Sequence, residues 1–139
     1  MSRLMAKRLA GFTLLEVLVV MAILAILVGM ALPGYRSYLE RGHRAQAIHA
    51  LHSISACQER LRAASGYYDT SRCLEGIDQQ HYTFGLKPRD EAASLAFTAI
   101  ATPINPSKRN RCGSLAIDQA GSTTISGETQ WLAACWGGR

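Results

Sequence analysis

Several features are missing from this 139-residue sequence, and each absence argues against one class of protein or site. No C-x-x-C pair occurs, which argues against a metal site built from the four cysteines. No residue stands in a nucleophile-elbow or P-loop frame, so neither an enzyme nor a cofactor is predicted. No internal repeat or low-complexity segment is present, and the length leaves room for one small domain beside a membrane span.

Polar residues are almost absent from Phe12 to Leu32, where only Thr13 and Glu16 interrupt the apolar run. At 1.5 Å per residue, about 21 helical residues span roughly 31 Å, close to the ~30 Å hydrocarbon thickness of a bilayer. The segment before the run contains no acid and three basic residues, Arg3, Lys7 and Arg8. This asymmetry predicts a membrane-spanning helix with its N-terminus in the cytoplasm and the rest of the chain outside.

Glu16 is the only charged residue within this span. A carboxylate in an apolar span costs roughly 2.5–3.5 kcal/mol on insertion scales, so it calls for an explanation. One interpretation is that Glu16 lies close enough to the interface to be hydrated. The other is that a cut between Gly11 and Phe12 creates an α-amino group about one helical turn before Glu16, which compensates its charge within a subunit or between neighbours.

The net charge of +5 lies mostly in the first 11 residues. Without them, 128 residues with a charge of +2 remain, from 12 basic minus 10 acidic residues. The basic character is therefore mainly a targeting feature and argues only weakly for nucleic-acid binding. All four cysteines follow the span, on the side predicted to be oxidising, so two disulfides are expected among three possible pairings.

Residues 35–65 contain no proline and repeat apolar residues at helical spacing. The predicted buried stripe consists of Ala47, Leu51, Ile54, Cys57, Leu61 and Ala64. Polar residues such as Gln58 fall largely off this stripe, and Gly66 is a natural stop. We therefore expect one helix over residues 12–65. A bend or local unwinding is expected near Gly29, because Pro33 cannot donate to the carbonyl four residues before it.

Four strand signals follow a loop-like stretch at residues 66–81. Residues 82–86 and 95–99 alternate apolar with polar or small residues, and shorter signals follow at 113–118 and 123–126. Pro103 and Pro106 bracket a turn between the second and third signals. One helix followed by four strands predicts an α+β fold, in which a four-stranded antiparallel meander packs on the amphipathic half of the helix.

The run Gly11-Phe12-Thr13-Leu14-Leu15-Glu16 follows a short basic leader and opens an apolar stretch that ends at Pro33. In this setting it resembles the class III signal of type IV prepilins. Residues 101–103, 111–115 and 118–121, with the final Cys135-Trp136, are similar to the small minor pilins of Gram-negative bacteria. An ordinary secretory signal fits less well, because no small-x-small cleavage site ends a short apolar core.

This resemblance implies the type IV pilin fold and a maturation route. In that family a membrane aspartyl peptidase cuts after the glycine, here Gly11, and methylates the new amino terminus, here Phe12. The glutamate, here Glu16, supports assembly by pairing with the terminal amine of an adjacent subunit. The implied parts are a cleaved leader (residues 1–11), a transmembrane and filament-core half-helix (residues 12–33) and a periplasmic head (residues 34–139).

The resemblance also implies partners and locations. The partners are the prepilin peptidase, other major and minor pilins, and the inner-membrane pilus assembly platform. The subunit would lie first in the inner membrane and then in an extracellular pilus that supports motility, adhesion or DNA uptake. No cofactor is implied.

The cysteine pairing that we favour is Cys57 with Cys73 and Cys112 with Cys135. Cys57 lies on the helix stripe and Cys73 in the loop after it, so their bond would attach the loop to the helix. Closing the segment between Cys112 and Cys135 would add about 3.5 kcal/mol on the chain-entropy model, and the resemblance implies that this segment is an exposed variable region. A free Cys57 thiol in the core is the alternative.

A basic turn, Lys108-Arg109-Asn110-Arg111, directly precedes Cys112. On a disulfide-closed loop, Lys108, Arg109 and Arg111 could contact DNA phosphates. They could also form a solvated turn, which is the simpler interpretation, or contact an acidic neighbouring subunit. Trp131 and Trp136 could stack on bases, although the resemblance suggests that Trp136 packs beside the disulfide.

The histidines favour no metal site. His49 and His52 stand three residues apart on the predicted helix, but no third ligand of suitable spacing is evident, so solvated histidines are expected. The function predicted from the sequence is a structural subunit of a type IV pilus, of the minor kind. A DNA-binding competence pilin and a pseudopilin of type II secretion are the alternatives.

Overall fold

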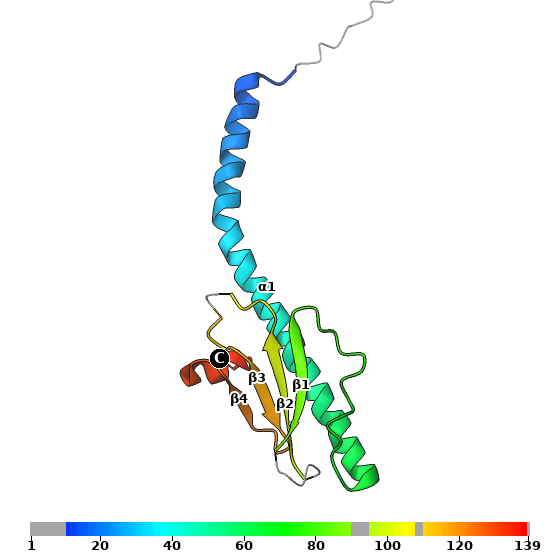
Figure 1. Ribbon diagram of the computed structural model, residues 1–139. Coiled ribbons are helices and arrows are strands. Elements are labelled where there is room, and N and C mark those ends of the chain that lie inside the picture. The colour runs from blue at the N-terminus through cyan, green and yellow to red at the C-terminus, as the bar shows by residue number, and fades with distance from the viewer. Residues whose placement is uncertain (1–10, 90–94, 108–109, 139) are drawn as a thin grey trace, which may run out of the picture. The chain divides into compact units, whose positions relative to one another are not determined.

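The computed structural model describes residues 11–89, 95–107 and 110–138 (Figure 1). Its elements, in chain order, are α1 (Leu14–Ser65), β1 (Tyr82–Pro88), β2 (Phe97–Pro103), β3 (Leu115–Asp118), β4 (Thr123–Ile125), η1 (Thr129–Trp131) and α2 (Leu132–Cys135). Two compact units divide the chain, one ending at Leu39 and one beginning at Glu40, which we call the head. Helix α1 therefore contributes residues to both units.

The first unit contains the apolar N-terminal part of α1. Every large apolar residue from Phe12 to Leu32 is exposed. This part of α1 is long and apolar enough to cross a membrane by length and composition, with a mean hydropathy of 2.8 over an 18-residue window. The local unwinding expected near Gly29 is absent from the described helix, which is helical from Gly29 through Gly34. Proline removes one backbone hydrogen bond, whereas further unwinding in an apolar surrounding would expose more unpaired groups at several kcal/mol each.

The head combines the C-terminal part of α1 with a four-stranded antiparallel meander in the order β1-β2-β3-β4. Tyr82 pairs with Pro103 across β1 and β2, and Ala99 pairs with Ile117 across β2 and β3. The helix lies along one face of the sheet (Figure 1). The core between them contains Ala47, Leu51, Ile54, Phe97, Ala99, Leu115 and Ile117. The predicted α+β architecture is confirmed.

Element boundaries differ modestly from the prediction. Strand β2 begins at Phe97 and extends to Pro103, and the chain bends at residues 104–105, between Pro103 and Pro106 as predicted. Strand β1 continues beyond residue 86 to Pro88. Helix α1 ends at Ser65, and Gly66 follows with φ +84°, donating to the Arg62 carbonyl oxygen at 2.7 Å. The predicted glycine stop is confirmed, because this left-handed conformation favours a residue without a side chain.

The predicted stripe on α1 is correct at its start and wrong at its end. Ala47, Leu51 and Ile54 are buried, but Ala64 is exposed. Gln58, which was expected largely off the stripe, is fully buried. Its amide compensates for the burial by donating to the Asp69 carbonyl oxygen at 2.7 Å and accepting from the Asp69 backbone N–H at 3.0 Å. Periodicity misses such a residue because the loop, and not the helix, supplies its partners.

Candidate assembly site and nucleic-acid interface

The predicted cleavage and assembly residues stand together at the start of α1. Gly11 and Phe12 precede the helix, and Thr13 is its N-cap, since its Oγ1 accepts a hydrogen bond from the Glu16 backbone N–H at 3.2 Å. The leader residues 1–10 lie outside the described residues. Thr13-x-x-Glu16 fits the capping-box pattern, a signal that the sequence analysis overlooked. Glu16 is exposed, so its carboxylate is accessible to a partner.

Glu16 can therefore act in two ways at one position. A carboxylate in the first turn stabilises a helix by about 0.3–1 kcal/mol through the helix dipole. The same carboxylate can pair with a cation from outside the chain, and such a pair in an apolar surrounding is far stronger than one in water. The start of the helix can be weakened without touching this carboxylate, because the Thr13 Oγ1 accepts from the Glu16 backbone N–H.

The structure contains both disulfides in the favoured pairing. Cys57 on α1 bonds to Cys73 in the following loop, with Cα atoms 5.9 Å apart. Cys112 bonds to Cys135 in α2, with Cα atoms 5.7 Å apart. Both separations fall in the range typical of disulfides. The first bond fixes the loop to the helix beside Gln58, and the second ties the segment after β2 to the C-terminal part of the chain.

Arg111 is the basic residue of this turn that the structure describes, and its side chain is held in place. Its guanidinium lies over the Trp131 ring, 4.7 Å from the ring centroid. Such a contact stabilises a cation by about 0.5–1 kcal/mol at an exposed site and fixes its orientation. Trp131 is fixed in turn, because its indole N–H donates to a Glu128 carboxylate oxygen at 3.2 Å.

The backbone at Arg111 is fixed by a close approach of two segments. The Arg111 carbonyl oxygen accepts from the Glu128 N–H at 3.2 Å, and the Cys112 carbonyl oxygen accepts from the Gly127 N–H at 3.1 Å. A side chain on Gly127 would overlap the Arg111 carbonyl group. Gly127 is therefore a glycine because the backbone of the basic turn passes directly against it.

Lys108 and Arg109, the other predicted DNA contacts, lie outside the described residues. Two further basic residues lie at or just after the end of β1. Lys87 is exposed at the end of β1. The Arg89 guanidinium donates to the Asp118 carboxylate at 2.9 Å, the one ion pair found among the described residues. That pairing reduces the charge that Arg89 can offer to another anion.

The two tryptophans pack against the protein. Both are partly buried beside the core. The Trp136 indole N–H donates to the Thr124 carbonyl oxygen at 3.3 Å, and its ring meets His52 edge to face. Neither ring stands free to stack on a base in this arrangement. Trp131 instead supports Arg111, a role that the sequence analysis did not predict.

Two of the histidines form a contact that their sequence spacing did not reveal. The rings of His43, on α1, and His81, just before β1, are stacked with centroids 3.5 Å apart. His49 and His52 are exposed. Within the described part of the chain, no group of three or more His, Cys, Asp or Glu side chains is placed to hold a metal ion.

Comparison with known proteins identifies the family. A family model described as "Type IV minor pilin ComP, DNA uptake sequence receptor" matches residues 33–116, which is more than half of the chain. The chain belongs to this type IV minor pilin family. A model of the prokaryotic N-terminal methylation motif matches residues 7–32 of the minor pilin, the region of the predicted leader and span.

A solved structure supports the same assignment. A type IV pilin from Shewanella oneidensis is 26% identical to this minor pilin, with 64% of this chain and 94% of that chain covered and a TM-score of 0.52. No curated protein matches the chain. The predicted type IV pilin fold and minor-pilin function are thereby confirmed. A pilin is a structural protein and not an enzyme, its partners are other pilins and the prepilin peptidase, and its location is the membrane and the pilus.

Proposed function

We propose that this minor pilin is made as a prepilin with its N-terminus in the cytoplasm and its head in the periplasm. The prepilin peptidase cuts after Gly11 and methylates Phe12, the inner-membrane assembly platform takes up the subunit, and the half-helix from residue 12 to 33 enters the filament core. The match of residues 7–32 to the methylation motif supports this route. The exposed apolar surface of α1 supports the last step, because that surface needs either lipid or other subunits around it.

We further propose that the head binds double-stranded DNA as a receptor for an uptake sequence. The observation that carries this proposal is the family match, since the matching model is described as a DNA uptake sequence receptor and spans residues 33–116. The sequence places Lys108 and Arg109 in the same segment as Arg111. An arginine held by an aromatic ring needs little ordering to contact a phosphate, and such contacts supply most of the affinity in protein–DNA complexes.

DNA binding by the mature full chain in detergent micelles tests this function. We expect the wild-type subunit to bind labelled genomic fragments of its native host better than fragments of an unrelated genome, with an affinity that falls as salt rises. Arg111→Gln is expected to weaken binding about tenfold and to lower the salt slope by about one.

Arg60→Gln is the matched control, because Arg60 is an exposed arginine of the head whose Nε donates to the Ala56 carbonyl oxygen of its own helix. Equal losses in the two variants would reduce the effect to net charge. Absence of DNA binding by the wild-type chain at low salt would refute the receptor function and leave the pilus role intact.

A further inference from the structure

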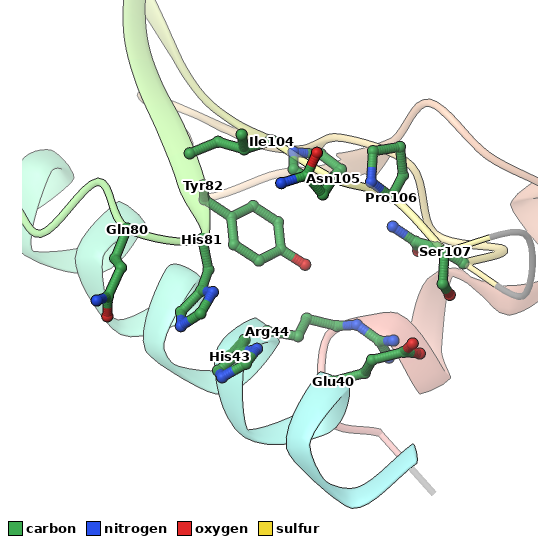
Figure 2. Close-up of a pocket in the computed structure, with 12 residues that line it drawn as sticks. Glu40, His43, Arg44, Gln80, His81, Tyr82, Ile104, Asn105, Pro106 and Ser107 are labelled. Atoms are coloured by element: carbon green, nitrogen blue, oxygen red, sulfur yellow. The ribbon is translucent and has the colours of Figure 1, made fainter. Parts of the chain in front are cut away.

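A small cavity opens in the head between three segments of the chain (Figure 2). It is lined by the turn of α1 from Glu40 to Arg44, by residues 80–82 and by residues 103–107 with Asn110. Its volume is about 100 Å³, several times the roughly 10–15 Å³ that one water molecule needs by the same measure. The cavity has space for a group of a few heavy atoms.

Several side chains that can donate hydrogen bonds line the cavity. The Arg44 Nε is buried and has no acceptor among the described residues. The Tyr82 hydroxyl points into the same space as the Arg44 guanidinium (Figure 2). Burial raises the pKa of Tyr82, and the adjacent Arg44 opposes this shift, so the phenol keeps its proton as a donor at neutral pH. The Asn110 Oδ1 already accepts from the Cys112 N–H at 3.1 Å, which leaves the amide nitrogen to donate.

The walls of the cavity are fixed by contacts within the head. The stacked rings of His43 and His81 form one wall, and an imidazole can donate an N–H. The Ile104 N–H donates to the His81 carbonyl oxygen at 3.1 Å, and the Asn110 N–H donates to the Ser107 carbonyl oxygen at 2.9 Å. The first bond holds Ile104 against the start of β1, and the second fixes Asn110 relative to Ser107, so these parts of the lining are positioned before any ligand arrives.

Glu40 is the acidic residue of the lining. It forms no ion pair with Arg44 within 4.0 Å, since Arg89 and Asp118 make the one such pair among the described residues. The Arg44 charge is therefore not neutralised by direct contact. The Glu40 carboxylate nevertheless repels an anion that enters the cavity, so it lowers the affinity for that anion.

We propose that this cavity binds a phosphodiester group of the DNA backbone. A phosphate accepts hydrogen bonds only, which suits a lining of donors around one guanidinium. Asn110, which lines the cavity, adjoins Arg111 in the chain. Since duplex DNA carries a charge about every 1.7 Å along its axis, a duplex on Arg111 has further phosphates within reach of the cavity. This inference rests on the proposed DNA binding and adds a contact to it.

Two substitutions with opposite expected effects on DNA affinity test the cavity in the mature full chain in micelles. Arg44→Gln is expected to weaken the binding of a 20-base-pair duplex about tenfold and to lower the salt slope by about one. Glu40→Gln is expected to tighten binding several-fold, and it carries little folding risk because Glu40 is exposed. Arg41→Gln, an exposed arginine on the same helix, is the control and should change affinity less than either.

A second measurement does not require DNA. Dimethyl phosphate should shift the ring NMR signals of His43 and His81 in the wild-type chain, and Arg44→Gln should abolish the shift.

DNA binding that is unchanged in both Arg44→Gln and Glu40→Gln would overturn the cavity contact while the receptor function stood. If the wild-type chain bound no DNA, the receptor function itself would be refuted, whether or not dimethyl phosphate shifted the histidine signals. Arg44-dependent binding to phosphatidylglycerol vesicles, with DNA affinity unchanged, would overturn the assignment in favour of a lipid headgroup.

Discussion

The two parts of α1 treat the same kind of residue in opposite ways. Leu51 and Ile54, in the head, have no exposed surface. Leu24 and Ile26, in the first unit, are 49% and 60% exposed, and all their large apolar neighbours are exposed as well. Burying one such side chain stabilises a protein by about 1.5–3 kcal/mol. The head is therefore complete within one chain, whereas the first unit needs lipid or further subunits to cover it.

The same contrast appears in how polar groups are satisfied. In the head, the buried amide of Gln58 has three hydrogen bonds to the backbone of Asp69 and Arg72. In the first unit, the described contact of Glu16 is through its backbone N–H to Thr13, which leaves the carboxylate to an external partner. The buried amide of Gln58 is satisfied within the head, whereas Glu16 presents its carboxylate outward.

Replacing the outward-facing charge should have the largest effect. We expect Glu16→Ala to insert into the inner membrane normally but to be almost absent from filaments, because the N-terminal amine of a neighbouring subunit loses its counter-charge. The measurement is the amount of subunit in sheared filaments relative to the membrane fraction, by immunoblot in the native host. Mass spectrometry of the membrane pool checks cleavage after Gly11 and methylation of Phe12.

Thr13→Val separates assembly from helix capping. It removes the Oγ1 that accepts from Glu16 but keeps the side-chain shape and the Glu16 charge. A lost cap costs about 1 kcal/mol, which a helix packed in lipid or a filament tolerates, so Thr13→Val should assemble. If Thr13→Val failed as completely as Glu16→Ala, capping alone would explain the defect and the pairing role would be lost.

Breaking the internal contacts should affect the head and spare the first unit. Gln58→Ala removes the Gln58 partner of the Asp69 N–H and of the Arg72 carbonyl oxygen, at about 1–3 kcal/mol for each unsatisfied group, whereas the Asp69 carbonyl oxygen still accepts from the Arg72 N–H at 3.2 Å. We expect the head to lose about 2–4 kcal/mol of stability in total. Urea unfolding in micelles measures this, followed by the fluorescence of Trp131 and Trp136, both of which lie in the head.

Gln46→Ala is the matched control, because Gln46 is an exposed glutamine on the same helix. It should change the unfolding midpoint little. Helical circular dichroism that persists after the tryptophan transition would come from the membrane part of α1. A midpoint for Gln58→Ala equal to that of Gln46→Ala would mean that the Cys57–Cys73 disulfide holds the loop without the buried amide.

The sequence predicts the architecture well because its strongest signals are local. Apolar periodicity identified Ala47, Leu51 and Ile54 as core residues, and the glycine at position 66 marked the helix end. The signal at Gly11 to Glu16 identified the family. These features depend on neighbours a few residues away, which a sequence displays directly.

The residues that sequence reasoning missed depend on distant partners. Gln58 is buried because residues 69–72 return to it, and Arg111 is held because Trp131 lies beneath it. His43 and His81 stack although 38 positions separate them in the chain. Thr13 is the exception, since the capping pattern with Glu16 was readable from local spacing and was passed over.

The smallest expected effect concerns Asp118, at the turn between β3 and β4, whose negative charge is compensated by groups of the head. Burial alone would raise the pKa of Asp118, but backbone N–H groups of Ser122 and Ala120 and the Arg89 guanidinium lower it below its ordinary value. A carboxyl with a lowered pKa in the folded state stabilises the fold above its unfolded pKa, near ~3.9, and this contribution is lost as the pH falls through the folded value. Asp118→Asn should therefore cost about 1–2 kcal/mol at pH 7.

The difference between wild type and Asp118→Asn should shrink as the pH is lowered from 6 toward 3. Asp69, whose pKa is lowered by hydrogen bonds from Ser71, also titrates in this range, but it is present in both proteins and cancels in their difference. Urea midpoints at a series of pH values, read by tryptophan fluorescence, measure the effect. A difference that stayed constant down to pH 3 would mean that Asp118 acts through the shape of its turn and not through its charge. The turn would then be held by packing and by hydrogen bonds from the backbone, which an amide side chain can also accept. In that case the negative charge would matter at Glu16 but not at Asp118.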